Sequence, residues 1–460
     1  MIKFGTDGWR GVIGDTFTFE NVRRVALAHA RVLADKGAKR VVVGYDRRFL
    51  SEAFATQVAG VFKEEGFEVF LSEKECTTPM VSFAVRYMGF DGGVMITASH
   101  NPPQYNGYKI KESSGGAATT EFIREVEEHL EKITNVKPPP TTGIERIDIE
   151  KTYINIVRQK VNMELLKEYP LLVVHDPMYG SSAGLLEKVL AGTEVSVVSI
   201  RHRHDPLFGG HAPEPVEKYL SPLMEKVRSI GAHLGVANDG DGDRLALVDE
   251  KGSFVNTQLV YVLLLLHLVK DKGMKDGVVV KTVSTTQLVD VVCAREGLKL
   301  IEVPVGFKHI NEIMQREKVL MGGEESGGFG LTHFLPERDG IFSALNIVEM
   351  LLERGKSLSD LVQDVWREYG RTYYSRIDLH VDEKTKEKLK NLLQNPPEKV
   401  GRFSVSHVST LDGLKLFFQG GGWLLMRASG TEPLIRVYGE MNTQEDLQQL
   451  LASATDMLGL

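Results

Sequence analysis

The residues best suited to chemistry are three aspartates at alternate positions in the segment Asp239-Gly240-Asp241-Gly242-Asp243-Arg244, called here the aspartate loop. Unpaired carboxylates this close together repel one another, so a hard cation is their expected partner. Three carboxylates leave coordination positions free for water or a phosphoryl oxygen, which favours Mg²⁺. The alternative is a solvated acidic turn that binds no metal.

The same segment matches part of the spacing of a calcium-binding EF-hand loop, with Glu250 at the twelfth position. However, Arg244 stands at the sixth position, where the sharp turn of that loop needs glycine. The flanking segments 234–237 and 245–248 are apolar and strand-like rather than helical. The sequence therefore argues against an EF-hand and predicts a metal-binding loop at the end of a strand.

A second candidate is the hydroxyl of Ser99 in the segment Thr97-Ala98-Ser99-His100-Asn101-Pro102, called here the serine loop. Its small residues and the following Pro103 predict a stiff, exposed loop. A phosphoserine there would carry nearly two negative charges and would need a cation and hydrogen-bond donors nearby. The alternative is a turn serine bonded to its own backbone. Together with the aspartate loop, the serine loop indicates phosphoryl transfer.

The glycine-rich segment 323–328, called here the sugar loop, contains Glu324, Glu325 and Ser326. Carboxylates do not bind phosphate, but they accept hydrogen bonds from the vicinal hydroxyls of a sugar. This composition therefore favours a sugar as ligand. A flexible acidic turn is the alternative.

The segment 427–431 combines the guanidinium of Arg427 with two hydroxyls and a glycine. Guanidinium, hydroxyl and backbone N–H groups together favour a phosphate. Arg436 offers a second guanidinium. Taken alone, this segment could equally be a surface turn.

Composition limits the possible classes of protein. The chain has 460 residues and a formal net charge of −7, which argues against nucleic acid as a main partner. Cys76 and Cys293 lack metal-ligand spacing, and two cysteines fit a reducing cytosol. The longest apolar run, 261–269, is far shorter than the ~20 residues that span a bilayer, and it predicts a buried helix. The N-terminus lacks an apolar signal core. We therefore expect a cytoplasmic protein that binds neither nucleic acid nor a membrane.

Helical and strand-like patterns alternate over most of the chain, which predicts α/β domains. The short apolar strands 92–96, 233–237 and 319–321 each end directly at the serine, aspartate or sugar loop. In open α/β sheets ligands bind at that end of the strands. A linker is expected at 138–143, and beyond Gly370 strand-like pieces and a closing helix over 443–458 predict a smaller α+β domain. The expected domains are 1–140, 141–252, 253–370 and 371–460.

In their order along the chain, the serine loop, the aspartate loop, the sugar loop and segment 427–431 resemble those of the α-D-phosphohexomutase family of phosphoglucomutases and phosphomannomutases. The resemblance extends from the segment 5–11, Gly-Thr-Asp-Gly-Trp-Arg-Gly, to Arg436. It implies three related α/β domains with mixed sheets and a smaller C-terminal α+β domain around a central cleft. It also implies Mg²⁺, a hexose phosphate substrate, glucose 1,6-bisphosphate as activator and intermediate, and a monomer or homodimer.

The same resemblance implies roles for individual residues around the reacting phosphate. Ser99 is similar to the phosphoserine of the active enzymes and would share the metal with the aspartate loop. Lys109 resembles a lysine proposed for acid/base work, and His100 is a second candidate for that work. Arg10 and Arg244 match arginines near the phosphoserine. The residues expected to bind substrate are Lys308, Glu324, Ser326, Arg427, Ser429, Gly430, Thr431 and Arg436.

The chain departs from the family pattern at Gly328, where many dual glucose/mannose members carry a histidine with an acid/base role. His333 aligns with a histidine of the glucose-type enzymes and is a further candidate. Glu325 matches the glucose-type loop, whereas phosphoglucosamine mutases usually carry glutamine there. We therefore expect a mutase that interconverts hexose 1-phosphate and hexose 6-phosphate through a phosphoserine and a hexose 1,6-bisphosphate, with glucose favoured over mannose. The alternatives are a phosphoglucosamine mutase, a sugar bisphosphate synthase built on the same site, and a non-catalytic protein that binds a sugar phosphate or a metal.

Overall fold

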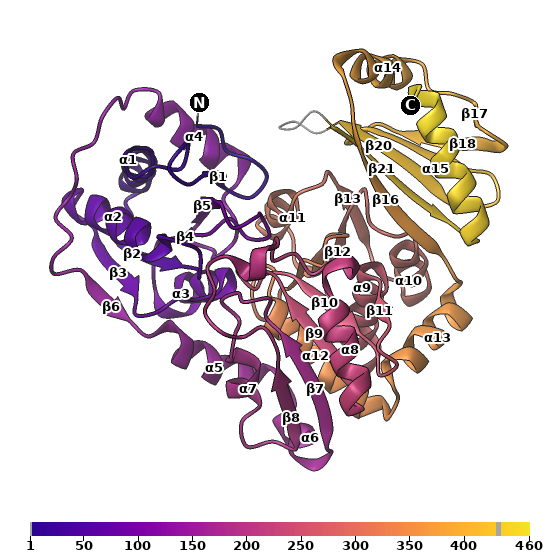
Figure 1. Ribbon diagram of the computed structural model, residues 1–460, viewed down its shortest axis with the longest axis horizontal. Coiled ribbons are helices and arrows are strands. Elements are labelled where there is room, and N and C mark those ends of the chain that lie inside the picture. The colour runs from indigo at the N-terminus through magenta and orange to yellow at the C-terminus, as the bar shows by residue number, and fades with distance from the viewer. Residues whose placement is uncertain (1, 429–433) are drawn as a thin grey trace. The chain divides into compact units, whose positions relative to one another are not determined.

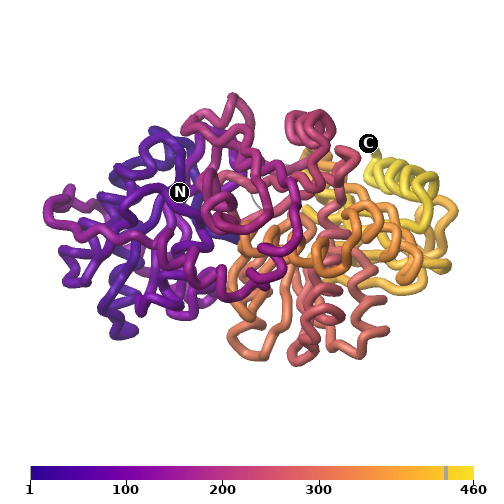
Figure 2. The backbone as a smooth tube through the Cα atoms, turned by 90° about the horizontal axis from the view of Figure 1, so that it is seen from below, coloured from indigo at the N-terminus to yellow at the C-terminus, as the bar shows by residue number. Residues whose placement is uncertain are grey.

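The computed structural model describes residues 2–428 and 434–460. The chain divides into two compact units, which are treated separately below. The first comprises Met1–Val278 and Gly306–Leu361, and the second comprises Val279–Val305 and Val362–Leu460. The N-terminus lies in the first unit, and the chain ends in the second at the helix coloured yellow (Figures 1 and 2).

The N-terminal part of the first unit contains a mixed six-stranded sheet in the order β1-β5-β4-β2-β3-β6. Its strands are β1 (Trp9–Val12), β2 (Arg40–Tyr45), β3 (Glu68–Ser72), β4 (Gly92–Ile96), β5 (Tyr105–Lys111) and β6 (Glu145–Ile147). Its helices are α1 (Phe19–Asp35), α2 (Ser51–Glu64), α3 (Thr78–Met88) and α4 (Thr120–Leu130). Strands β4, β2, β3 and β6 run parallel, whereas β5 and β1 are antiparallel to their neighbours. The linker expected at 138–143 lies between α4 and β6.

Helices cover both faces of this sheet (Figure 1), which explains the unbroken apolar run of β2. Val41 and Val43 belong to the core formed with α1, α2 and α4. Val42 points to the other face, where Val81 and Val85 of α3 pack close to Gly93. The sheet therefore holds the end of β4, and the serine loop that follows it, between two helical layers.

The next part of the first unit is a five-stranded sheet in the order β11-β10-β9-β7-β8. Its strands are β7 (Leu171–Asp176), β8 (Val195–Ser199), β9 (Leu234–Asn238), β10 (Leu245–Val248) and β11 (Phe254–Val255). Its helices are α5 (Ile149–Lys160), α6 (Met163–Glu168), α7 (Leu185–Leu190), η1 (Phe208–Gly210), η2 (Glu217–Tyr219) and α8 (Ser221–Ile230). Asn238 pairs with Leu245 across the antiparallel strands β9 and β10, so the aspartate loop is the tip of a hairpin between two buried strands.

The remainder of the first unit contains a largely apolar helix and a second functional hairpin. Its elements are α9 (Thr257–Leu266), η3 (His267–Asp271), α11 (Phe307–Met314), β14 (Val319–Gly323), β15 (Phe329–Leu331) and α12 (Gly340–Arg354), followed by α13 (Leu358–Tyr369), which continues into the second unit. Residues 260–269 are buried, which confirms the buried helix expected for the apolar run. No helix in the described part of the chain is both long and apolar enough to cross a membrane. Strands β14 and β15 are antiparallel and are joined by the sugar loop.

The second unit contains β12 (Val278–Thr282) from its second residue on, the parallel strand β13 (Leu300–Val303), helix α10 (Leu288–Glu296) and a six-stranded antiparallel sheet. That sheet has the order β16-β21-β20-β19-β18-β17. Its strands are β16 (Tyr373–His380), β17 (Lys399–Val400), β18 (Phe403–Ser409), β19 (Leu414–Phe418), β20 (Trp423–Ala428) and β21 (Leu434–Met441). Helices α14 (Glu383–Gln394) and α15 (Gln444–Leu458) pack on it around a shared apolar core. The smaller C-terminal α+β domain expected from the sequence is therefore confirmed.

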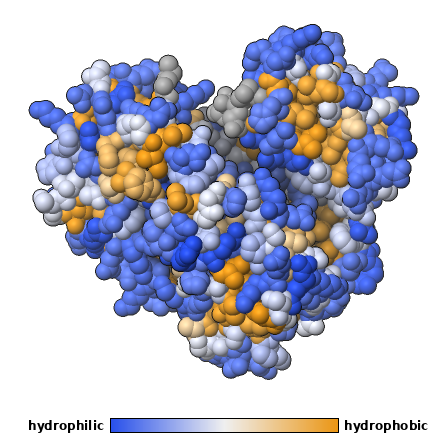
Figure 3. All heavy atoms as spheres, in the orientation of Figure 1, coloured by the Kyte–Doolittle hydropathy of each residue, from blue (hydrophilic) through white to orange (hydrophobic). Residues whose placement is uncertain are grey.

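The face of the molecule drawn in Figure 3 is mainly hydrophilic, and its apolar residues gather in separate patches, one of them over the C-terminal sheet. Such patches are ordinary for proteins, because much of any folded surface consists of apolar atoms.

Candidate active site

The serine loop begins directly after β4 and holds Ser99 in an unusual conformation. Ser99 has a φ of 51°, in the left-handed region that costs a residue with a Cβ atom about 1 kcal/mol or more. Its N–H donates to Thr97 Oγ1 over 2.9 Å, and its Oγ donates to Asp239 Oδ2 over 2.8 Å. The expectation of an exposed loop was wrong for Ser99, which is 1% exposed, because the aspartate loop covers it.

The aspartate loop presents three fully buried carboxylates to one point. One ligand atom from each of Asp239, Asp241 and Asp243 lies within 4.8 Å of the others. Asp239 Oδ1 accepts the N–H groups of Asp243 (3.0 Å) and Arg244 (3.1 Å), so this oxygen shapes the loop while Oδ2 faces Ser99. Burial and the two neighbouring carboxylates raise the pKa of Asp239.

The buried Oδ1 atoms of Asp241 and Asp243 have no hydrogen-bond partner among the described residues. A buried carboxylate oxygen left without a donor is costly. Oxygen donors from three carboxylates are what Mg²⁺ prefers, so the residues present fit that ion.

Lys109 on β5 is the main cation of this cluster. Its Nζ lies 2.8 Å from Asp241 Oδ2, 2.9 Å from Asp243 Oδ2 and 2.7 Å from Asp7 Oδ2. Burial lowers the pKa of Lys109, but the three carboxylates outweigh burial and raise that pKa far above its usual value. Burial likewise raises the pKa of Asp241, and Lys109 together with the Thr78 hydroxyl reverses the shift to well below the usual range. In this arrangement Lys109 is a charged ion-pair partner.

Arg10, His100 and Arg244 surround Ser99. Arg10 Nη1 donates to Asn101 Oδ1 over 2.6 Å, and Arg244 Nε lies 4.0 Å from Asp239 Oδ2. His100 Nδ1 is 3.4 Å from Ser99 Oγ. Burial, with Arg244 and Arg10 nearby, holds the pKa of His100 well below its usual value, so the ring is neutral at physiological pH.

Arg338 connects the aspartate loop to the sugar loop. Its Nη2 is 2.9 Å from Asp243 Oδ2 and 2.7 Å from Asp7 Oδ2, and its Nη1 is 3.3 Å from Glu324 Oε2. Neither Arg338 nor Asp7 was among the site residues predicted from the sequence. Both lie in motifs that the family resemblance covers, but the ion pair joins positions 331 residues apart, which no local pattern reveals.

The sugar loop places its first carboxylate in a buried position. Glu324 is 7% exposed, and burial, only partly opposed by Arg338, raises its pKa to about 7. The Leu245 N–H donates to Gly327 O over 2.9 Å, so the sugar loop rests against the strand that follows the aspartate loop. Ser326 is half-buried beside it.

The structure also shows the surroundings of Gly328, where the chain departs from the family pattern, and of His333, the further acid/base candidate. A Cβ atom at Gly328 would overlap with Cδ of Arg338, so this arginine fills space that a larger residue at 328 would need. His333 packs against Phe342, with ring centroids 5.2 Å apart, and burial lowers its pKa to about 4. The charges that act on His333 come from Lys272, Lys160 and Glu349, outside the Ser99 cluster. The structure does not bring His333 to the site.

In the second unit, Arg427 and Arg436 are paired across β20 and β21, so their side chains lie on the same face of the sheet. Arg427 Nε donates to Asp412 Oδ2 over 2.7 Å. The predicted residues Ser429, Gly430 and Thr431 lie outside the described residues. In the first unit, Lys308 is half-buried in the first turn of α11.

Comparison with known proteins identifies the family. The four phosphoglucomutase/phosphomannomutase models match in order: α/β/α domain I over residues 1–137, α/β/α domain II over 151–252, α/β/α domain III over 257–369 and the C-terminal domain over 379–457. The chain therefore belongs to the phosphoglucomutase/phosphomannomutase family, and it is a phosphohexomutase. The three α/β domains and the fourth, smaller domain expected from the sequence are confirmed.

Individual relatives agree on the family but differ in the substrate that they are named for. A phosphoglucomutase/phosphomannomutase of Thermococcus kodakarensis is 32% identical over 459 residues, covering 99% of this chain and 98% of that protein. A protein of Methanothermobacter thermautotrophicus named "Probable phosphoglucosamine mutase" is 33% identical over 447 residues, covering 96% and 94%. A crystal structure from Thermus thermophilus that bears the name of a phosphomannomutase is 34% identical, with a TM-score of 0.89 and coverage of 100% and 99%.

Proposed function

We propose that this phosphohexomutase interconverts hexose 1-phosphate and hexose 6-phosphate, with glucose favoured over mannose, and that Ser99 carries the transferred phosphoryl group. The observation that carries the proposal is the 2.8 Å contact between Ser99 Oγ and one of three buried carboxylates that fit a divalent cation. A protein that only binds a sugar phosphate has no need of a strained, buried hydroxyl beside such a cluster.

The proposed cycle has two phosphoryl transfers. In the first, the bond between phosphorus and Ser99 Oγ breaks as a bond forms to the free hydroxyl oxygen of the hexose monophosphate, and that hydroxyl loses its proton to a base. The resulting hexose 1,6-bisphosphate then presents its other phosphate, which returns to Ser99 and leaves the isomeric monophosphate. Glucose 1,6-bisphosphate would also act as activator, because it can phosphorylate a free Ser99.

Charge neutralisation is the main task of the protein in such a transfer. Mg²⁺ held by Asp239, Asp241 and Asp243 would supply positive charge beside the phosphoryl group. The guanidinium groups of Arg10 and Arg244 would contribute as well, because Arg10 Nη1 donates to Asn101 Oδ1 in the serine loop and Arg244 Nε lies 4.0 Å from Asp239 Oδ2, the oxygen that faces Ser99.

Two residues are candidates for moving the proton. The neutral ring of His100 lies beside Ser99 Oγ and can accept a proton. Lys109 can act as a base only if it loses its charge, and Asp7, Asp241 and Asp243 oppose that loss. Burial and the nearby arginines oppose a charged His100 just as the carboxylates oppose a neutral Lys109, so both residues stay candidates for the base.

The remaining predicted residues would bind the substrate. Glu324, Ser326 and Lys308 would contact the sugar. Arg427 and Arg436, on one face of the C-terminal sheet, would hold the phosphate that is not reacting. Ser429, Gly430 and Thr431 complete the expected phosphate-binding set.

Glucosamine phosphate is the second candidate substrate. Relatives named for phosphoglucosamine and relatives named for glucose and mannose are similarly distant from this chain, at 33% and 32% identity. Glu325 matches the loop of the glucose-type enzymes, which favours glucose.

The test is a coupled assay with a panel of substrates. The purified protein is incubated with Mg²⁺, a trace of glucose 1,6-bisphosphate and the 1-phosphate of glucose, mannose or glucosamine in turn, and formation of the 6-phosphate is followed. Fastest turnover of glucose 1-phosphate supports the proposal, and fastest turnover of glucosamine 1-phosphate selects the alternative. Absence of turnover on all three contradicts the mutase assignment.

A further inference from the structure

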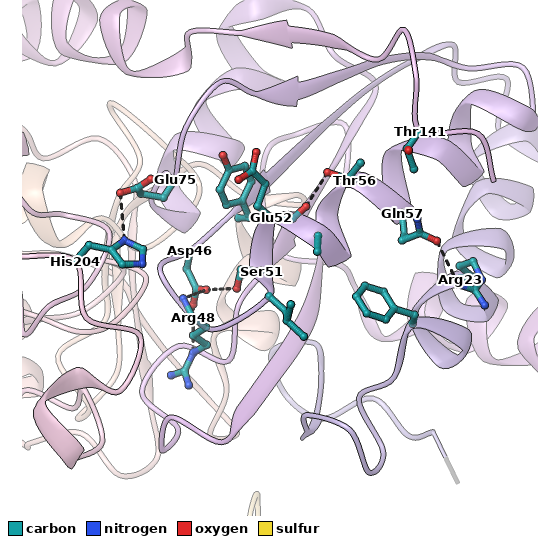
Figure 4. Close-up of a pocket in the computed structure, with 14 residues that line it drawn as sticks. Arg23, Asp46, Arg48, Ser51, Glu52, Thr56, Gln57, Glu75, Thr141 and His204 are labelled. Atoms are coloured by element: carbon teal, nitrogen blue, oxygen red, sulfur yellow. Dashed lines mark hydrogen bonds and ion pairs between the residues drawn. The ribbon is translucent and has the colours of Figure 1, made fainter. Parts of the chain in front are cut away.

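Arg48 lies behind the serine loop and has no role in the function proposed so far. It follows β2, before helix α2, in the wall of a pocket of about 800 Å³ (Figure 4). Its side chain is completely buried. Figure 4 shows Arg48 beside Asp46 and Ser51 at one end of this pocket. A buried guanidinium is costly unless its donors are satisfied, so its partners indicate its purpose.

The guanidinium binds four backbone carbonyls around the serine loop. Nη2 donates to Ser99 O and Asn101 O, both over 2.6 Å. Nη1 donates to Pro102 O over 2.9 Å and to Tyr105 O over 3.0 Å. Only a planar, forked cation can reach four carbonyls in this way, because a lysine ammonium has three donors at a single point.

Asp46 fixes both Arg48 and the start of the loop. Its Oδ2 lies 3.2 Å from Arg48 Nε and accepts the Thr97 hydroxyl over 2.6 Å. Its Oδ1 accepts the Arg48 N–H over 2.9 Å and the Ser51 hydroxyl over 2.6 Å. Since Thr97 Oγ1 in turn accepts the Ser99 N–H, Asp46 and Arg48 hold Ser99 from both of its peptide groups.

The guanidinium has little freedom to move. The ring of Phe208, from the 3-10 helix η1, lies with its centroid 4.9 Å from Arg48 Cζ. Cation–π contact adds to the attraction on that side. Arg48 is therefore enclosed by the serine loop, Asp46 and Phe208.

These contacts explain how Ser99 keeps its left-handed backbone. A non-glycine residue holds such a conformation only where its surroundings over-determine it. We propose that Arg48, anchored by Asp46, is a positioning residue that locks the serine loop so that Ser99 Oγ faces the aspartate loop. This inference rests on the proposed role of Ser99 as phosphoryl carrier. Arg48 acts through the loop and not on the substrate.

The matched experiment compares Arg48→Lys with Arg47→Lys. Arg47 is the adjacent arginine, and it binds Glu75 and His202 O rather than the serine loop. We expect Arg48→Lys to lower kcat about 100-fold, since a misplacement of about 1 Å can cost that much, while KM for the hexose phosphate stays close to wild type. Arg47→Lys should keep both constants. A kcat for Arg48→Lys equal to that of Arg47→Lys would overturn the inference.

A second variant tests the inference even if Arg48→Lys does not fold. Thr97→Val removes the hydroxyl that links Asp46 to the Ser99 N–H and keeps nearly the same volume. We expect kcat to fall again with KM little changed. An unchanged kcat would count against the positioning of the serine loop by Asp46 and Arg48.

A readout without turnover separates this inference from the proposed function. In crystal structures of the wild type and of Arg48→Lys, we expect Ser99 to leave the left-handed region only in the variant. An unchanged Ser99 φ and an intact contact to Asp239 in the variant would refute the proposal that Arg48 positions the serine loop. Absence of activity in the wild type would instead refute the proposed function.

Discussion

The aspartate loop and the sugar loop both bury carboxyl groups, but the pKa values of Asp241 in the first and Glu324 in the second shift in opposite directions. Lys109 Nζ lies 2.8 Å from Asp241 Oδ2 and, against the effect of burial, holds the pKa of Asp241 well below the usual range. Glu324 Oε2 lies 3.3 Å from Arg338 Nη1, and burial, only partly opposed by this cation, raises the pKa of Glu324 to about 7. Asp241 therefore stays charged in its ion pair with Lys109, whereas Glu324 is a carboxyl group that gains or loses a proton near physiological pH.

The largest effect on mutase activity should come from removing the charge of Asp241. Asp241→Asn keeps the size of the side chain but removes a carboxylate from the proposed metal set. We expect mutase activity to fall about 100- to 1000-fold, because charge at the reacting phosphoryl group is no longer offset. Steady-state rates measured over a range of Mg²⁺ concentrations check this, and excess Mg²⁺ should not restore them.

Asp249→Asn is the matched control for that substitution. Asp249 is also buried, directly after β10, but it holds the turn to Ser253. Its substitution should leave the dependence on Mg²⁺ unchanged. An equal loss in both variants would show that the fold, rather than the charge at Asp241, is responsible.

The next effect should come from breaking the link between the two loops. Arg338→Met removes the cation shared by Asp243, Asp7 and Glu324 and keeps most of the volume. Removal of one partner from a buried ion pair costs about 3–5 kcal/mol, so we expect a marked loss of stability in urea unfolding. A change below about 0.5 kcal/mol would contradict the role of Arg338 as the link.

A smaller effect should follow from filling the space beside Arg338. In Gly328→Ala the new methyl group would meet Cδ of Arg338, and we expect unfolding free energy to fall by about 1–3 kcal/mol. In an Arg338→Ala background the same substitution should cost almost nothing, because the obstacle is gone. Equal costs in both backgrounds would show that Arg338 is not what limits the size of residue 328.

The smallest effect should be the dependence of folding stability on pH that is due to Glu324. Its pKa is about 7 in the folded protein and near 4.5 when unfolded, so the folded state binds the proton more tightly. Stability should therefore fall as pH rises from about 4.5 through about 7, which is the opposite of a salt-bridged carboxyl group. Thermal unfolding of the wild type and of Glu324→Gln between about pH 5 and pH 8 measures this. Parallel curves for the two proteins would mean that Glu324 does not titrate in this range.

The sequence predicts the functional loops well, because each follows a short apolar strand and such strands have a clear pattern. The runs before Thr97, Asp239 and Gly323 become β4, β9 and β14. The mixed sheets and the separate C-terminal domain follow from the same patterns and from the family resemblance.

The partners of the functional residues could not be predicted in the same way. The burial of Ser99 comes from the aspartate loop, 140 residues further along the chain, and Arg48 reaches Ser99 O across 51 residues. Arg48, Asp46 and Arg338 have no distinctive local spacing, so only the folded arrangement shows what they hold.

The most direct test of the central claim is the intact mass of the protein after incubation with Mg²⁺ and glucose 1,6-bisphosphate. We expect the wild type to gain one phosphoryl group, located on Ser99 by peptide mapping, and Ser99→Ala to gain none and to lose mutase turnover while its thermal unfolding is preserved. Turnover by Ser99→Ala at the wild-type rate, or phosphorylation at another residue, would contradict the account.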